Sequence, residues 1–142
     1  MADLMTFACN NGYCESILRG LRSSFLAENS YSQMKNCGSM AELKSFLEET
    51  DYAPFLMAEA SNIPVSLLRQ RLKRKLADEF EYLKAQSVGT LSEFLNLFSC
   101  QYMIDNIVNM IEGIKNKVDT DLLLANSDPL GYFPEMKNIK VY

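Results

Sequence analysis

Hydrophobic residues recur at intervals of three and four along most of the chain, the spacing that places side chains on one face of a helix. One face of the first such run, residues 10–29, carries Tyr13, Ile17, Leu18, Leu21, Phe25 and Leu26. Asn10 and Asn11 are candidates for the cap at its start, because an asparagine side chain accepts a hydrogen bond from an unpaired first-turn amide. The pattern therefore predicts a helix that begins near Asn10.

Capping signals and prolines mark the starts of four further helices. Residues 39–42 read Ser-Met-Ala-Glu and residues 90–93 read Thr-Leu-Ser-Glu, and both fit the capping-box pattern. Pro64 precedes the longest helical pattern, and Asp119 precedes a short one. The helices expected from these signals are a short one after Ser39, then 65–86, 91–115 and a short one through 122–124. A regular stripe in 65–86 comprises Leu68, Leu72, Leu76, Phe80 and Leu83.

The last stretch, residues 126–142, differs from the rest in composition. It contains two prolines and a glycine, which predict a turn followed by an extended tail, and 138–142 carries a weak strand pattern. Short connections between long helices favour antiparallel neighbours. We therefore expect an all-α helical bundle that forms a single domain over residues 1–142.

Composition narrows the classes of function. The chain has 142 residues, 48% of them hydrophobic and 23% charged, with a net charge of −4. This is a globular profile, and its acidic balance argues against nucleic-acid binding through a broadly basic surface. No apolar run reaches the ~18 residues that a membrane span needs. We expect a globular protein that meets a membrane, if at all, from outside.

The residue types that support catalysis are sparse. Without histidine there is no Ser-His or Cys-His pair, and the four cysteines show no CxxC spacing for zinc. The cysteines read as reduced thiols buried as small hydrophobes. Cys14, near the predicted start of the first helix, is the candidate for a thiol with a pKa lowered by the helix dipole. We expect no enzyme activity, metal or cofactor.

Asp105 and Asn106 stand near the middle of an apolar helix and admit three interpretations. At about 100° per residue, Asp105 lies on a polar stripe with Asn109 and Glu112, and Asn106 borders it. Asp105 is then a solvent-exposed carboxylate, a structural carboxylate paired with an arginine such as Arg19 or Arg22, or a catalytic group.

A basic run on the longest predicted helix is the candidate partner surface. It includes Arg69, Arg71, Lys73, Arg74 and Lys75. Such a run suits phosphate, lipid head groups or an acidic partner. The alternative is a solvated face braced by Arg74–Asp78 and Lys75–Glu79 pairs, each four residues apart.

Several short stretches together resemble one known family. They are Asn11-Gly12-Tyr13 with Arg19-Gly20, Thr50-Asp51-Tyr52 with Phe55-Leu56, Tyr102-Met103-Ile104-Asp105-Asn106, and Pro129-Leu130-Gly131. Their order is that of subunit d of the vacuolar-type ATPase, a family that also has archaeal and bacterial members. The resemblance covers nearly the whole chain but well under half of a family member, and it corresponds to the N-terminal part.

The resemblance implies a fold and a role. The chain would be one of the three related helical units that form the funnel of this family, and a non-catalytic coupling subunit. Its partners would be the proteolipid ring and the central stalk of a rotary proton pump. It would lie on the cytoplasmic face of an acidic-organelle membrane, held there through protein contacts. The alternative is a free-standing helical protein–protein interaction module.

A subunit that couples the stalk to the ring would carry torque, and it resists shear only if its helices are well packed and its buried polar groups are paired. The resemblance therefore also favours a polar lock, meaning buried polar side chains that hydrogen-bond between helices. Asp105 and Asn106 are its candidates, and Asn11, Tyr13 and Arg19 are candidate partners by residue type. On this hypothesis the Asp105→Ala change destabilises the fold by roughly 1–3 kcal/mol.

Overall fold

The structure, a computed structural model, describes residues 4–138 and is helical, with no strand among those residues. The all-α prediction is therefore confirmed. The chain divides into two compact units, residues 1–79 and 80–142, which are described separately below. The expected single domain over 1–142 stays a prediction.

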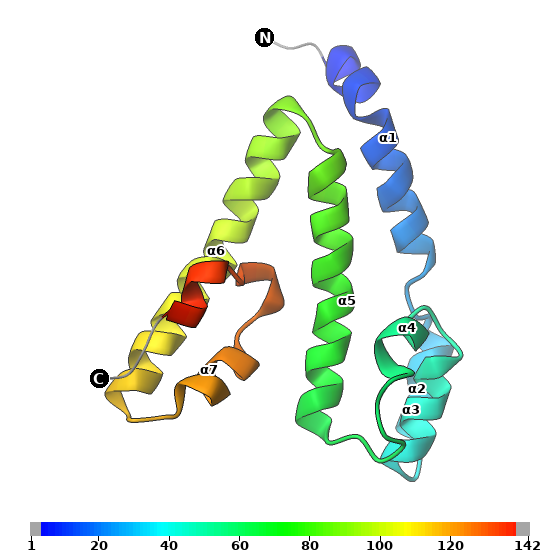
Figure 1. Cartoon of the computed structure of the whole chain (residues 1–142). Coiled ribbons are helices and arrows are strands. Elements are labelled where there is room, and N and C mark those ends of the chain that lie inside the picture. The colour runs from blue at the N-terminus through cyan, green and yellow to red at the C-terminus, as the bar shows by residue number, and fades with distance from the viewer. Residues whose placement is uncertain (1–3, 139–142) are drawn as a thin grey trace. The chain divides into compact units, whose positions relative to one another are not determined.

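The first helix, α1 (Leu4–Ser23), starts earlier than predicted (Figure 1). Asn10 and Asn11 lie inside it, so the predicted cap is wrong; the preceding residues contain no proline or glycine that would stop the helix from extending. The face prediction is also shifted. Asn11 and Cys14 are buried, whereas Tyr13 is 60% exposed.

Unit 1 folds around one apolar cluster. Its remaining helices are α2 (Glu28–Lys35), α3 (Met40–Glu48), α4 (Ala53–Leu56) and the first part of α5 (Val65–Gln86). The core consists of the buried Leu47, Leu56, Ile63 and Leu68. The side chain of Ser39 accepts the amide of Glu42 at 3.2 Å, and the Glu42 carboxylate accepts the amide of Gly38 at 2.8 Å. This confirms the capping signal at Ser39.

The predicted bounds of α5 are confirmed, but its stripe is only partly inward. Leu68 and Leu83 are buried, whereas Leu76 is 55% exposed. Lys75 and Ala77 are buried, one residue to either side of Leu76. Lys75 reaches this position because its charge pairs with Glu79 and its ammonium lies 5.0 Å from the centre of the Tyr52 ring.

Unit 2 is built on one long helix. Its elements are the end of α5, α6 (Gly89–Lys115), α7 (Thr120–Asn126) and the 3-10 helices η1 (Pro129–Gly131) and η2 (Pro134–Asn138). The capping box at Thr90 does not form. The N-cap is Val88, which makes no side-chain cap bond, because the helix already begins at Gly89. At α7 the Asp119 carboxylate accepts the Asp121 amide at 3.2 Å, so this capping prediction is confirmed.

The segment expected to be an extended tail contains helical turns. Within the described part of residues 126–142, η1 and η2 follow α7, and η1 packs against α6 (Figure 1). The turns form because Asp128 and Pro134 start them with fixed local geometry. Residues 139–142, which carry most of the weak strand pattern, lie outside the described residues.

Candidate functional site

Asn106 is the most buried polar residue of α6. The residue is 2% exposed, and its side-chain amide makes two hydrogen bonds to the backbone of Asp128, 22 residues later. Nδ2 donates to the Asp128 carbonyl at 2.9 Å, and Oδ1 accepts the Asp128 amide at 2.8 Å. One side chain thus satisfies both polar groups of a distant peptide segment, as a neighbouring strand would.

Asp128 in turn shapes the segment that Asn106 holds. Its Oδ1 accepts the Leu130 amide at 3.1 Å, and its carbonyl accepts the Gly131 amide at 3.1 Å. Pro129 occupies the first helical position, where a missing amide costs nothing. The turn from Asp128 to Gly131 is therefore locally determined before it meets α6.

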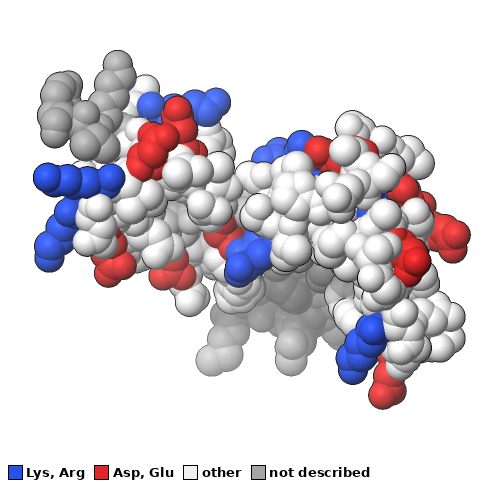
Figure 2. All heavy atoms as spheres, turned by 90° about the horizontal axis from the view of Figure 1, so that it is seen from below, with Lys and Arg blue, Asp and Glu red and all other residues white. Residues whose placement is uncertain are grey.

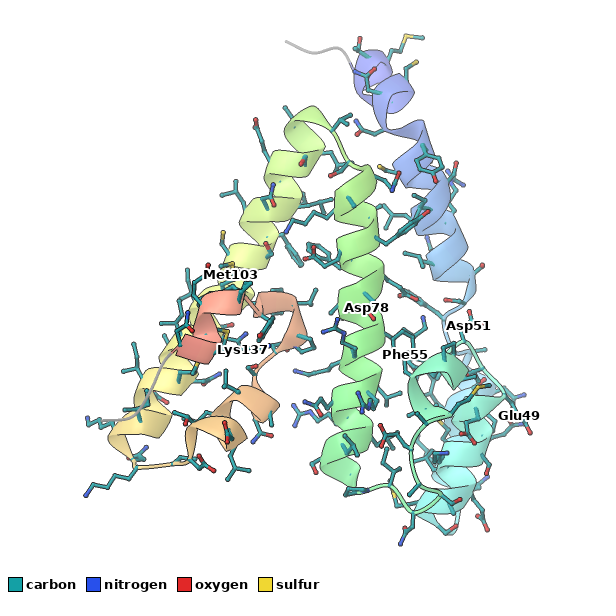
Figure 3. All side chains as sticks on the ribbon, in the orientation of Figure 1. Glu49, Asp51, Phe55, Asp78, Met103 and Lys137 are labelled. Carbon is teal, nitrogen blue, oxygen red and sulfur yellow. The ribbon has the colours of Figure 1, made fainter. Side chains whose placement is uncertain are left out.

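Gly131 brings this turn into direct backbone contact with α6. A Cβ placed on Gly131 would lie 2.2 Å from the carbonyl carbon and oxygen of Tyr102 and 2.6 Å from the amide nitrogen of Met103. Both neighbours are backbone atoms, so only glycine fits without moving the helix or the turn. Figure 3 labels Met103 on α6 and Lys137 in the η2 segment that follows the turn.

We call these contacting groups the helix–turn joint. It comprises Tyr102, Met103 and Asn106 of α6, and Asp128, Pro129, Leu130 and Gly131 of the turn. Within the joint Leu130 is buried, and Met136, five residues after Gly131, is buried as well. Two of the sequence stretches that carry the family resemblance, Tyr102–Asn106 and Pro129–Gly131, therefore meet in space.

A second close approach fixes α7 below the joint. A Cβ on Gly113 would lie 2.3 Å from the Cδ2 of Leu123, so α7 packs where α6 has no side chain. Beside it is a cavity of about 150 Å³ lined by Asn106, Asn109, Met110, Leu123, Asn126 and Ser127. This cavity is smaller than the roughly 300–1,000 Å³ of typical ligand pockets. The close approach at Gly113 packs α7 against α6.

Asp105 and Asn106, the two candidates for the polar lock, lie in different environments in the structure. Asn106 is buried and bonded as described, whereas Asp105 is exposed. Adjacent residues point about 100° apart on a helix, so only one of them can face the turn. The favoured expectation of a buried Asp105 is therefore not met, and the destabilisation expected for Asp105→Ala belongs to Asn106.

The three candidate partners of the lock lie in unit 1. Asn11 is buried in α1, Tyr13 is exposed, and the Arg19 guanidinium lies 2.6 Å from the Glu15 carboxylate on the same helix face. Their contact with Asp105 or Asn106 stays a prediction. Sequence reasoning missed Asp128 as the partner of Asn106; the Asp-Pro-Leu-Gly turn pattern was the available signal.

The basic run of α5 is braced largely by neighbouring acids. Arg71 Nε donates to Glu59 at 2.7 Å, Arg74 Nε lies 2.8 Å from Asp78, and Lys75 pairs with Glu79. The two pairs predicted at a spacing of four are confirmed.

Arg69 and Lys73 line an apolar groove of about 460 Å³ in unit 1, and their role as a partner surface stays a prediction. Blue and red side chains intermix on the face in Figure 2 without a continuous field of one sign.

The cysteines differ in their exposure. Cys14 is buried about three turns into α1, beyond the first turn in which a helix dipole acts. Cys9 and Cys100 are exposed, so the expectation of uniformly buried thiols is wrong.

Among the described residues there is no cluster of three or more potential metal ligands. No helix within residues 4–138 is long and apolar enough to cross a bilayer.

One family model and several curated proteins match this chain over most of its length. The ATP synthase (C/AC39) subunit family matches residues 14–142. V-type proton ATPase subunit d of Dictyostelium discoideum is 35% identical over 97% of this chain and 39% of its own length. The Saccharomyces cerevisiae protein of that name is 34% identical over 95% of this chain and 39% of its own length. The Neurospora crassa protein is 37% identical over 93% and 36%, respectively.

The matched region includes α6, α7 and the helix–turn joint. The chain spans about two fifths of the length of these curated relatives. The match nevertheless extends over most of the chain. This protein therefore belongs to the ATP synthase (C/AC39) subunit family.

Proposed function

We propose that this chain acts as the N-terminal part of a subunit d-like, non-catalytic subunit of a vacuolar-type proton-pumping ATPase. In this role it links the central stalk to the proteolipid ring. The observation that carries the proposal is the family match over residues 14–142, with relatives that are named V-type proton ATPase subunit d. The chain would lie peripherally on the cytoplasmic face of an acidic-organelle membrane, bound through protein contacts.

The helix–turn joint supports such a role physically. An adaptor between rotating parts has to transmit torque without internal shear, and close packing with paired buried polar groups resists shear. Asn106 ties α6 to the turn by two hydrogen bonds, and Gly131 allows backbone-to-backbone contact. These contacts tie the turn to the long helix, which is what the proposed role requires.

The test uses membrane vesicles from cells that lack the native protein. We expect ATP-driven acidification of these vesicles to be lost and to return when the native protein is supplied. Gly20→Ala, where the added Cβ meets open space, is expected to restore acidification fully. Gly131→Ala, where it meets the α6 backbone, is expected to restore it poorly. Normal acidification in cells that lack the protein would contradict the proposal.

A further inference from the structure

The outward side of α6 carries a second apolar stripe with the spacing of a coiled-coil seam. Counting in heptads, the a positions are Phe94, Gln101, Val108 and Lys115, and the d positions are Leu97, Ile104 and Ile111. We call these seven residues the outer seam. Apolar side chains at a and d form the contact surface when helices pack as a coiled coil.

The apolar members of the outer seam are exposed. These residues range from 46% exposed at Val108 to 71% exposed at Leu97. The buried residues of α6 are Leu95, Ser99, Asn106, Met110 and Gly113, which lie on the opposite face at about 100° per residue. α6 is therefore apolar on two sides, and the helix–turn joint occupies only one of them. An exposed apolar stripe of this kind, interrupted only by Gln101 between Phe94 and Ile111, is typical of an interaction site.

Acidic side chains flank the outer seam. Asp105 and Glu112 occupy e positions, Glu93 occupies a g position, and all three are exposed. Within residues 4–138, none of these three carboxylates is in an ion pair. Because e and g residues select the partner of a coiled coil, unneutralised acids here favour a partner helix with cations at the facing positions.

We propose that the outer seam binds an amphipathic helix of another protein whose apolar stripe is flanked by lysine or arginine. A second copy would bring the same acids to both sides of the seam, and in an antiparallel pair Asp105 and Glu112 would face these acids directly, which like-charge repulsion disfavours. An anionic membrane surface is disfavoured for the same reason, since helices that bind it carry cations beside the apolar face. The assignment gives Asp105 a role at the edge of an interface. It does not depend on the proposed function.

Binding to two designed peptides tests the proposal. Both are helices of about three heptads with leucine at a and d; one carries lysine and the other glutamate at e and g. Fluorescence anisotropy with the full chain measures each Kd. We expect the lysine peptide to bind at least about tenfold more tightly than the glutamate peptide, because like charges across an interface are costly.

Variants of the chain locate the site. Asp105→Lys with Glu112→Lys is expected to reverse the peptide preference, and Ile104→Glu is expected to abolish binding. These residues are exposed, so circular dichroism should show unchanged helix content. Glu135→Lys, an exposed charge reversal in η2, is the matched control and should leave the preference unchanged.

Four results would overturn the proposal. They are equal affinity for both peptides, no binding of either, dimerisation that Ile104→Glu abolishes in light scattering, and binding to phosphatidylserine vesicles that the same variant abolishes. The last two would assign the outer seam to a second copy or to a membrane.

Discussion

At the scale of single residues, the structure depends on side chains that replace backbone partners. Asn106 offers one donor and one acceptor in the geometry of a peptide group, and Asp128 presents the complementary pair. A buried polar group that loses a hydrogen bond costs about 1–3 kcal/mol. The Asp128 carbonyl also accepts the Gly131 amide, so the contribution of Asn106 lies mainly in its bond to the Asp128 amide.

Asn106→Ala is therefore expected to lower the free energy of unfolding by about 1–3 kcal/mol, because the Asp128 amide and carbonyl lose the Asn106 amide as a partner. Urea unfolding followed by circular dichroism measures this. Asn109→Ala, an exposed asparagine on the same helix, is the control and should shift stability by less than about 0.5 kcal/mol. Equal effects of the two variants would show that the bonds of Asn106 contribute nothing specific.

The two glycines offer a matched pair of alanine substitutions. Gly131→Ala is expected to destabilise by about 1–3 kcal/mol, since the methyl group would overlap the backbone of Tyr102 and Met103. Gly20→Ala places the same group in open space within α1 and should stabilise by up to about 1 kcal/mol. Thermal unfolding of both variants gives the comparison, and a neutral Gly131→Ala would show that the close approach is not required.

At the scale of elements, some helix ends could be predicted from nearby residues and others could not. The bounds of α5 and the caps at Ser39 and Asp119 were predictable, because each depends on residues within one turn. The early start of α6 was not, because its N-cap residue, Val88, makes no side-chain cap bond that would mark it. The early start of α1 at Leu4 was missed because the apolar spacing was read only from Asn10 onward. The hydrogen bonds between Asn106 and Asp128 could not be predicted from hydrophobic periodicity, because they join residues that are 22 apart in the sequence.

The C-terminal end of α6 is capped in the common way, but a lysine occupies the position that is usually glycine. The Lys117 amide donates to the Ile114 carbonyl and the Val118 amide donates to the Gly113 carbonyl, both at 2.9 Å, which is the Schellman pattern. Lys117 takes the left-handed position with φ of 57°, where glycine is usual.

We expect Lys117→Gly to raise the free energy of unfolding by about 0.5–1 kcal/mol, because it removes the Cβ strain of the left-handed conformation. Chemical denaturation measures the change. Gly89→Ala, at φ of 58° at the other end of α6, makes the opposite exchange and should destabilise. A destabilising Lys117→Gly would mean that the lysine side chain contributes more than its strain costs.

At the scale of the whole molecule, family membership and local structure support one account. The chain spans about two fifths of its curated relatives, and its two units consist of helices with short connections. The fold class was predictable because periodicity is a local signal that repeats along the chain. A partner surface is less predictable, because a stripe of hydrophobic residues reads the same whether it packs inward or stays exposed, as the two apolar sides of α6 show.

The most direct test of the central claim is co-purification of the native protein. The protein, tagged in its own cells, is isolated from membranes in mild detergent, and its companions are identified by mass spectrometry. We predict that proteolipid subunits and central-stalk subunits of a vacuolar-type ATPase are recovered with it in constant ratio. Recovery of the protein free of every ATPase subunit, from cells that contain an assembled pump, would contradict the account.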